Sequence, residues 1–263
     1  MILLLAFILG ALVGSFLNCI IYRLEANEDF IKGRSYCPHC KETIGAMDLI
    51  PILSFLFLRG RCRHCDGKIS FQYPIVEIVT GIIFAVIVFY QLNEGLLETT
   101  YLLAIFSLMI VMFVYDLKHY LIPDEAVFTA IGASLVWHGS LFLSGAMSSS
   151  EAIIFFLSGI GSASFFWSLF IISKGAWLGF GDVKLALFMG LFLGYPGILV
   201  ALFSSFTSGA IIGSVMVFLK KKEIRDEIPF APFLIFGTTL AFFWGEPILN
   251  WYFNILSINV LNI

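Results

Sequence analysis

The feature that most constrains this chain is a series of long, uninterrupted apolar runs. A helix needs about 20 apolar residues to cross a bilayer core of about 30 Å. Eight segments approach or meet that requirement, at residues 2–22, 73–92, 99–115, 126–147, 152–173, 183–194, 197–219 and 229–245. A transmembrane β-barrel would instead show short segments of alternating polarity. The sequence therefore predicts an all-α integral membrane protein with about eight transmembrane helices.

Composition excludes most other classes of protein. Of the 263 residues, 60% are hydrophobic and 13% are charged, whereas soluble domains average about 45–50% apolar and about 25% charged residues. The chain as a whole is therefore not a soluble enzyme, a disordered protein or a collagen. The first run has no basic residue before it and no small-residue cleavage site, so we interpret it as a retained helix. The run at 183–194 is short for a span and is expected to be tilted or to begin earlier.

The basic residues predict an orientation in the membrane. With eight spans, 14 of the 15 lysines and arginines fall in connections that share one side, and Lys184 lies on that side at the start of the sixth run. The charged residues on the opposite side are all acidic. Because cytoplasmic connections carry the excess of Lys and Arg, this side is predicted to be cytoplasmic, with both termini outside. Lys220, Lys221 and Lys222 could also attract anionic lipid. The net charge of −3 identifies no partner; we expect the lipid bilayer around the helices and no nucleic acid.

One long polar stretch, residues 23–72, follows the first span. It holds two Cys-x-x-Cys pairs, Cys37 with Cys40 and Cys62 with Cys65, separated by 21 residues. Two such pairs at this spacing indicate a structural zinc site in which four thiolates surround the ion. The alternative is two disulfides or a redox pair, but disulfides are rare in a reducing cytoplasm. The stretch is too small to build much of a core, so zinc is expected to contribute to its folding.

Other residues of the insertion, and the fifth cysteine of the chain, are expected to have structural roles. His39 and His64 lie inside the cysteine pairs and are expected to be solvent-facing turn residues rather than ligands. The apolar run between the pairs is too short to span, and it is expected to pack on the zinc lobe or lie at the membrane surface. Gly60 would permit the turn into the second pair. Cys19, in the first span, is expected to be a small buried residue.

Two aspartates at the membrane edge are the candidate catalytic residues, because carboxylates there are costly and indicate function. Asp116 ends the third run, Asp182 begins the sixth, and the predicted orientation places both at the cytoplasmic boundary. An aspartyl protease needs one ionised aspartate to take a proton from water and one protonated aspartate to donate to the scissile carbonyl. Two carboxylates held close share a proton in this way. The alternative is that each caps a helix or pairs with Lys118 or Lys184, but their joint placement favours catalysis.

Two glycines and two further acidic residues also lie near the predicted membrane edge. Gly179 and Gly181 lack a Cβ, so a substrate strand could approach the backbone there. Asp124 precedes the fourth run and is predicted to cap its helix. Glu77, one turn into the second run, is expected to pair with a basic residue of the insertion or to face a ligand pocket.

Taken together, these motifs resemble those of the bacterial type IV prepilin peptidases, a family of Gly-x-Gly-Asp aspartyl membrane proteases that act as leader peptidases and N-methyltransferases. The matching strings follow the family's order along nearly the whole chain. They are Gly14-Ser15-Phe16-Leu17-Asn18 with Ile21-Tyr22-Arg23, Cys37-Pro38-His39-Cys40, Ile50-Pro51-Ile52-Leu53-Ser54, Arg59-Gly60-Arg61-Cys62, Tyr73-Pro74-Ile75-Val76-Glu77, Asp116 with Ile122-Pro123-Asp124, Gly179-Phe180-Gly181-Asp182-Val183-Lys184 and Ile228-Pro229-Phe230-Ala231-Pro232-Phe233.

The resemblance implies a multi-pass enzyme of the bacterial cytoplasmic membrane. It implies cleavage of the basic leader of type IV prepilin-like precursors, after a glycine, on the cytoplasmic face. The new N-terminal residue is then methylated with S-adenosylmethionine. The family's catalytic aspartates correspond to Asp116 and Asp182. Glu77 and Gly60 are candidates for S-adenosylmethionine binding, and no nucleotide-binding glycine motif supports them.

The implied organisation has three parts. Residues 1–22 form the first transmembrane helix, 23–72 the methyltransferase-associated zinc insertion, and 73–263 the peptidase core. One alternative is a Gly-x-Gly-Asp peptidase without methyl transfer, although relatives of that kind lack the cysteine insertion. Another is a zinc-regulated transporter, which would place ionisable groups near the bilayer midplane. In this sequence His138 is the only titratable group deep in a predicted span, and the carboxylates lie at the cytoplasmic edge.

Overall fold

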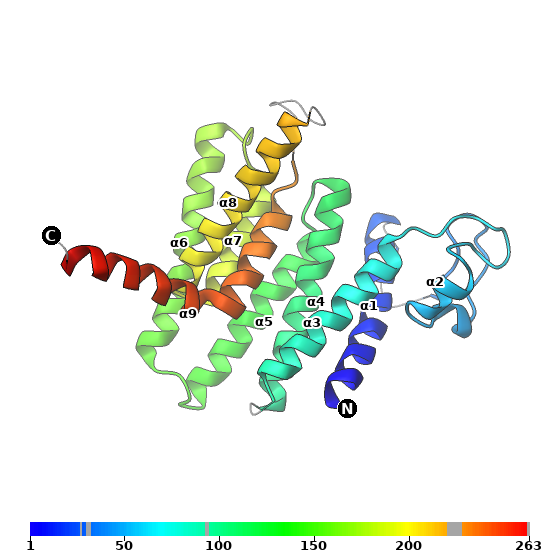
Figure 1. Ribbon diagram of the computed structural model, residues 1–263, viewed down its shortest axis with the longest axis horizontal. Helices are drawn as coiled ribbons and strands as arrows, with labels where there is room; N and C mark the ends of the chain where they lie inside the picture. Colours follow the sequence, from blue (N-terminus) through cyan, green and yellow to red (C-terminus); the bar gives the residue numbers. More distant parts are fainter. Residues whose placement is uncertain (27, 30–32, 93–94, 220–227, 262–263) are drawn as a thin grey trace. The chain divides into compact units, whose positions relative to one another are not determined.

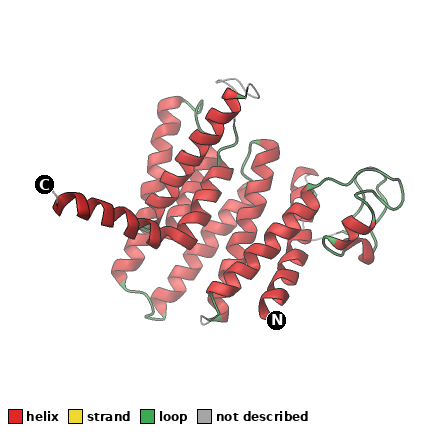
Figure 2. Cartoon of the chain, viewed as in Figure 1, coloured by secondary structure: helices red, strands yellow, loops and turns green. Residues whose placement is uncertain are grey.

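The computed structural model describes residues 1–263 except 27, 30–32, 93–94, 220–227 and 262–263, and it describes no side chains beyond 255. Within those residues the secondary structure is entirely helical apart from two isolated β-bridges, which confirms the predicted all-α class (Figure 2). Several basic residues used for the predicted orientation lie outside the described residues, namely Lys32, Lys220, Lys221, Lys222 and Arg225.

Among the described residues, seven helices are long and apolar enough to cross a membrane. Their membrane-crossing stretches are Ile2–Ala26, Gln72–Tyr90, Leu96–His119, Asp124–Leu143, Ser149–Ser173, Gly197–Phe218 and Ala231–Ile255. The short sixth span corresponds to α7, Phe180–Leu193, which has 14 residues and begins earlier than the apolar run. At about 1.5 Å per residue it is about 21 Å long.

The chain forms two compact units, Met1–Val111 and Met112–Ile263. In the first, α1 (Ile2–Ala26) packs along α3 (Gln72–Tyr90). The helices touch at glycines: a Cβ on Gly10 would lie 2.7 Å from the Thr80 carbonyl oxygen. The polar insertion between them contains η1 (Ala46–Leu49) and α2 (Leu53–Phe57).

In the second unit, the short helix α7 is surrounded by longer ones. It contacts α5 (Asp124–Leu143), α6 (Ser149–Ser173), α8 (Gly197–Phe218) and α9 (Ala231–Leu261), as Figure 1 also shows. Its side chains are correspondingly buried, and those of Leu185, Phe188 and Met189 have no exposed surface. A helix that is apolar on all sides can be short, because its neighbours rather than lipid cover it.

Small residues bring the helices of this unit together. A Cβ on Gly190 of α7 would lie 2.3 Å from the Ser158 carbonyl oxygen of α6, and one on Gly237 of α9 would lie 2.3 Å from the Ala201 carbonyl oxygen of α8. The Ser162 hydroxyl of α6 donates to the Ala186 carbonyl oxygen of α7 at 2.7 Å. Close backbone approach and interhelical hydrogen bonds are the usual means of holding helices together in lipid.

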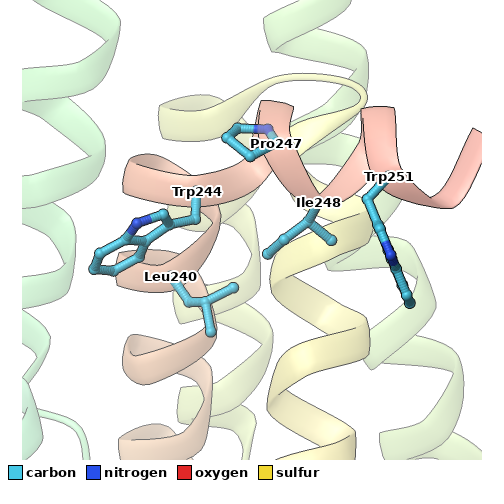
Figure 3. A pocket seen from close by; sticks show the side chains of 5 residues that line it. All are labelled: Leu240, Trp244, Pro247, Ile248 and Trp251. Carbon is cyan, nitrogen blue, oxygen red and sulfur yellow. The ribbon is translucent and has the colours of Figure 1, made fainter. Parts of the chain in front are cut away.

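The last helix continues beyond the eighth apolar run. That run ends at residue 245, whereas α9 extends to Leu261 with Pro247 inside it. Figure 1 shows α9 changing direction in its C-terminal half, and proline accounts for the bend because it removes one backbone hydrogen bond. A shallow apolar groove follows the bend, lined by Leu240, Trp244, Pro247, Ile248 and Trp251 (Figure 3).

Candidate active site and metal centre

Asp116 lies in the last turn of α4 (Leu96–His119), and its side chain is buried. The helix ends just beyond it, because Tyr120 takes a left-handed conformation with φ of 58°. The carboxylate Oδ2 accepts a hydrogen bond from the backbone N–H of Ala231 at 3.2 Å. Ala231 is the first residue of α9, so the aspartate at one helix end binds an otherwise unpaired amide at the start of another.

Asp182 lies in the first turn of α7 and is also buried. Its carboxylate Oδ2 accepts a hydrogen bond from the Gly179 backbone N–H at 3.0 Å, and its own N–H donates to the Gly179 carbonyl oxygen at 3.1 Å. This reciprocal pairing fixes the start of the helix three residues before the apolar run. A carboxylate is also favoured at this position by the helix dipole.

The second unit brings these two aspartates together. They are close enough for the charge of Asp116 to act on Asp182. The alternative of lysine ion pairs is not realised, since among the described residues both carboxylates are bonded by backbone amides. On each carboxylate those amides engage Oδ2, and Oδ1 carries no hydrogen bond from the described residues. Each carboxylate therefore keeps one oxygen that no described residue occupies.

Lys184 pairs with Asp124 instead of Asp182. The prediction that Asp124 caps its helix is wrong: α5 begins at Asp124 itself, and Pro123 occupies the capping position without a side-chain hydrogen bond. The Lys184 ammonium also lies 5.5 Å from the ring centre of Phe128 and 5.3 Å from that of Phe180. This cation between two aromatic rings joins the first turn of α5 to that of α7.

Of the two glycines before Asp182, Gly181 has an internal neighbour. A Cβ there would lie 3.2 Å from the Cβ of Ile122, so the bare backbone accommodates the loop before α5 rather than a substrate. At Gly179 the nearest atom to an added Cβ would be the Asp182 carboxylate, 3.7 Å away. Gly179 is the more open of the two positions.

The four cysteines of the insertion converge. The sulfur atoms of Cys37, Cys40, Cys62 and Cys65 all lie within 4.8 Å of one another, and no disulfide joins them. Those of Cys37 and Cys65 are 3.9 Å apart. A zinc tetrahedron with Zn–S distances of about 2.3 Å has edges of about 3.8 Å. The donor set and spacing therefore fit zinc.

The two cysteine loops repeat the same backbone pattern, 25 positions apart. In the first, Cys37 N–H donates to the Glu42 carbonyl oxygen and Lys41 N–H to that of Cys37, at 2.9 and 2.8 Å. In the second, Cys62 N–H donates to Gly67 and Asp66 N–H to Cys62, at 2.8 and 3.1 Å. Each loop turns through a left-handed residue, Lys41 or Asp66.

This loop geometry points backbone N–H groups at the sulfur atoms. The amides of His64 and Cys65 lower the pKa of the Cys62 thiol to about 6, because they stabilise the thiolate, whereas burial and the neighbouring sulfur atoms raise the pKa of Cys65 to about 12. A metal site needs thiolates, so the loops are suited to a cation. His39 and His64 are exposed and are not part of the sulfur cluster. Cys19 is half-buried, and its sulfur contacts the Ser35 hydroxyl at 4.0 Å.

Glu77 and Gly60 both contact the segment around α2. The Glu77 carboxylate is buried, and its Oε2 accepts a hydrogen bond from the Ile52 backbone N–H at 2.7 Å; the Ser15 hydroxyl is its other partner. Glu77 therefore binds the backbone of the insertion rather than one of its basic residues. Gly60, with φ of 68°, makes the predicted turn, and a Cβ there would lie 3.1 Å from the Phe55 ring.

Sequence reasoning missed the partners that are backbone amides. The N–H groups of Ala231 and Ile52 bind buried carboxylates, yet neither residue type carries a chemical signal in the sequence. The Pro at 229, two residues before α9, was the available indication that a helix with free N–H groups begins there. The ion pair of Asp124 with Lys184 was missed because the nearer aspartate in sequence, Asp182, was considered instead.

Comparison with known proteins gives two matches to family models. The bacterial peptidase A24 N-terminal domain matches residues 8–91, which include the four cysteines, and the type IV leader peptidase family matches residues 103–214, which include both aspartates. No solved structure matches.

Curated relatives align over nearly the full length of the chain. Proteins named prepilin leader peptidase/N-methyltransferase are 32% identical in Aeromonas hydrophila, 33% in Bacillus subtilis (strain 168) and 34% in Legionella pneumophila. The alignments cover 94%, 94% and 91% of this chain and 92%, 96% and 90% of the relatives. The two family models and these relatives together establish that the chain belongs to the type IV leader peptidase family and carries the bacterial N-terminal domain of peptidase A24.

Proposed function

We propose that this protein cleaves the leader from type IV prepilin-like precursors and then methylates the new N-terminus. The relatives named prepilin leader peptidase/N-methyltransferase align with nearly all of this chain. Their family is one of aspartic proteases. One structural observation carries the peptidase half: two buried aspartates on separate helices lie close together, each with one oxygen left for chemistry.

The mechanism we propose for cleavage uses Asp116 and Asp182 as a pair sharing one proton. The ionised carboxylate takes a proton from water as the water oxygen bonds to the scissile carbonyl carbon. The protonated carboxyl group donates its proton to the carbonyl oxygen. The carboxyl group that took the proton from water then gives it to the nitrogen as the C–N bond breaks, and the other carboxylate recovers its proton from a hydroxyl of the intermediate as the carbonyl forms again. The amides of Gly179 and Ala231 hold each carboxylate in position during these transfers.

Methyl transfer is assigned to the unit that contains the zinc insertion. Zinc held by the four cysteines would have a structural role, because they would fill all four positions of a tetrahedral site. S-adenosylmethionine, when bound, would supply the methyl group to the new amino group, which loses a proton, and S-adenosylhomocysteine would be released. Glu77 is proposed to bind the donor through its second carboxylate oxygen, and Gly60 to hold the Phe55 ring and α2 beside it.

We also propose that the insertion and both aspartates lie at the cytoplasmic face of the membrane. The one-sided distribution of Lys and Arg supports placing the insertion and both aspartates at the cytoplasmic face. Transport is not favoured: His138 is bonded through Nδ1 to the Ser134 carbonyl oxygen and stacks on the Phe155 ring at 4.2 Å. Both contacts are those of a structural residue.

The test is intact-mass analysis of a prepilin incubated with the purified protein and S-adenosylmethionine. We expect loss of the leader and gain of one methyl group. The variants Asp116→Asn and Asp182→Asn should each lose cleavage by about 10²- to 10⁴-fold. A matched control is Glu246→Gln, which removes an exposed carboxylate of the same unit and should change neither reaction.

A second substrate separates the two activities. A peptide that already begins at the mature N-terminus should be methylated by both aspartate variants, since they are assigned only to cleavage. Leader loss without methylation of either substrate would remove the methyltransferase half. Cleavage that persists in both aspartate variants would overturn the aspartyl mechanism.

A further inference from the structure

The insertion carries an exposed apolar surface around η1 and α2. Most large apolar side chains of residues 46–58 face outward rather than into a core, and Phe71, just before α3, does the same. The exposed fractions are 75% for Met47, 38% for Leu49, 40% for Ile50, 51% for Leu53, 63% for Leu56, 82% for Phe57 and 71% for Phe71. An apolar surface of this kind needs a partner that excludes water.

The hydrogen bond between Glu77 and Ile52 fixes the depth of this surface. Ile52 is the residue before α2, and its amide is 2.7 Å from the Glu77 carboxylate. Glu77 lies five residues into α3, which is about 7.5 Å along the helix from its first residue. The start of α2 is therefore beside the transmembrane helix rather than beyond its end, and Figure 1 shows α2 alongside α1 and α3.

At the same level, α3 carries apolar side chains that are exposed on a candidate membrane span. Ile75 and Ile78, on either side of Glu77 in sequence, are 56% and 37% exposed and belong to a candidate membrane span. Phe71 joins this helix surface to the insertion, because its ring lies 5.3 Å from that of Phe55 in α2. The apolar surface of the insertion thus continues the lipid-facing surface of the helix.

The charges around the surface have the arrangement of an interfacial segment. Within residues 46–58 the only charged side chain is Asp48, and the Arg63 guanidinium binds both of its carboxylate oxygens, at 2.6 and 2.9 Å. That contact lowers the pKa of Asp48 by hydrogen bonding. Arg59 and Arg61 follow directly and are exposed. Apolar side chains flanked by cationic ones are typical of segments that lie at an anionic lipid surface.

We propose that residues 46–58, together with Phe71, form a membrane-surface anchor of the zinc insertion. The apolar side chains enter the boundary between headgroups and acyl chains, where such segments sit about 5–10 Å deep. Arg59 and Arg61 contact the phosphate headgroups. The insertion is therefore fastened to the membrane at three places, by α1, by α3 and by this surface between them.

The test measures depth in nanodiscs of phosphatidylethanolamine and phosphatidylglycerol, without substrate. A nitroxide is attached to p-acetylphenylalanine at position 53 or 57, which leaves the zinc cysteines unmodified. Collision of each nitroxide with O₂, which concentrates in lipid, is compared with collision with a water-soluble nickel chelate. The matched controls carry the label at Glu42 or His64, exposed polar positions of the two cysteine loops. Zinc content confirms that each labelled protein retains its folded insertion.

We expect a several-fold higher ratio of O₂ to nickel collisions at 53 and 57 than at 42 and 64. Equal ratios at all four positions would overturn the anchor. A label at 57 that is open to nickel in the nanodisc, and becomes protected only when a prepilin is added, would also overturn it and identify the surface as a substrate site. Neither result depends on whether the protein cleaves or methylates its substrate.

Discussion

The aspartate pair and the cysteine cluster are held in place by different means. Around Asp116 and Asp182, five helices bury one another, and residues such as Phe166 and Phe188 have no exposed surface. In the insertion, Cys37 is the only buried residue among those described between 28 and 71. The first site is positioned by close packing, and the second by two hydrogen-bonded loops that the proposed zinc ion would join. We therefore expect the two sites to fail under different perturbations.

Removal of zinc should have the largest effect and should be confined to the insertion. Structural zinc contributes on the order of 10 kcal/mol to the folding of small metal domains. The replacement Cys62→Ser, or a chelator, should abolish amide-exchange protection in residues 33–71. Protection of α7 should not change. An equal loss of amide-exchange protection in α7 would show that the folding of the second unit depends on zinc in the insertion.

Packing substitutions should destabilise the second unit and leave the zinc insertion unchanged. Their effect on stability should be smaller than that of zinc removal. Gly190→Ala places a Cβ 2.3 Å from the backbone of α6, which must then move away. We expect a loss of about 1–3 kcal/mol of stability, seen as a lower thermal midpoint of the second unit, with zinc affinity unchanged. Gly161→Ala on α6 is the control, because no atom lies within 4 Å of the added Cβ. An equal loss in the control would contradict the packing argument.

The ion pair between Lys184 and Asp124 should influence cleavage without removing it. It joins the first turns of α5 and α7, and α7 carries Asp182 two residues before Lys184. We expect Lys184→Gln to lower kcat for cleavage by about tenfold with little change in KM, because a displaced carboxylate is poorly aligned. The exchange of both charges, Asp124→Lys with Lys184→Asp, should restore part of the rate. A change in KM alone would assign Lys184 to substrate binding instead.

The smallest effect is expected for the ion pair of the insertion. Asp48 and Arg63 are bonded through two oxygens, but Arg63 is largely exposed. Solvent-exposed pairs often contribute nothing measurable. Asp48→Asn should change the rate at which a chelator removes zinc by less than about threefold. A larger change would mean that this pair, and not the metal alone, maintains the cysteine cluster.

Periodicity and spacing predicted most of the fold, since lipid imposes strong rules on sequence. The apolar runs located the spans to within a few residues, and the short sixth run corresponded to α7. Hydropathy could not locate helix ends that are fixed by polar contacts. The start of α7 at Phe180 depends on the hydrogen bond between Asp182 and Gly179, and α9 extends through Pro247, which the apolar run did not reach.

The sequence predicted which residues gather at the candidate metal site better than it predicted the hydrogen-bond and ion-pair partners of the carboxylates. Cysteine spacing predicted the sulfur cluster because two tight turns carry all of the ligands. The contacts of Asp124 and Glu77 depend on three-dimensional proximity, and their partners are 60 and 25 residues distant. A capping residue and an ion-pair partner have the same sequence signature at a helix start, so the pattern could not distinguish the two roles of Asp124.

The bond from the Ala231 amide to Asp116 links the end of α4 to the last helix of the chain. The two residues are 115 positions apart, so the donor is synthesised long after its acceptor. A nascent chain that has inserted α4 and α7 possesses both carboxylates but not the amide that fixes the first of them. Under the proposed mechanism, cleavage should therefore begin only after α9 has been inserted.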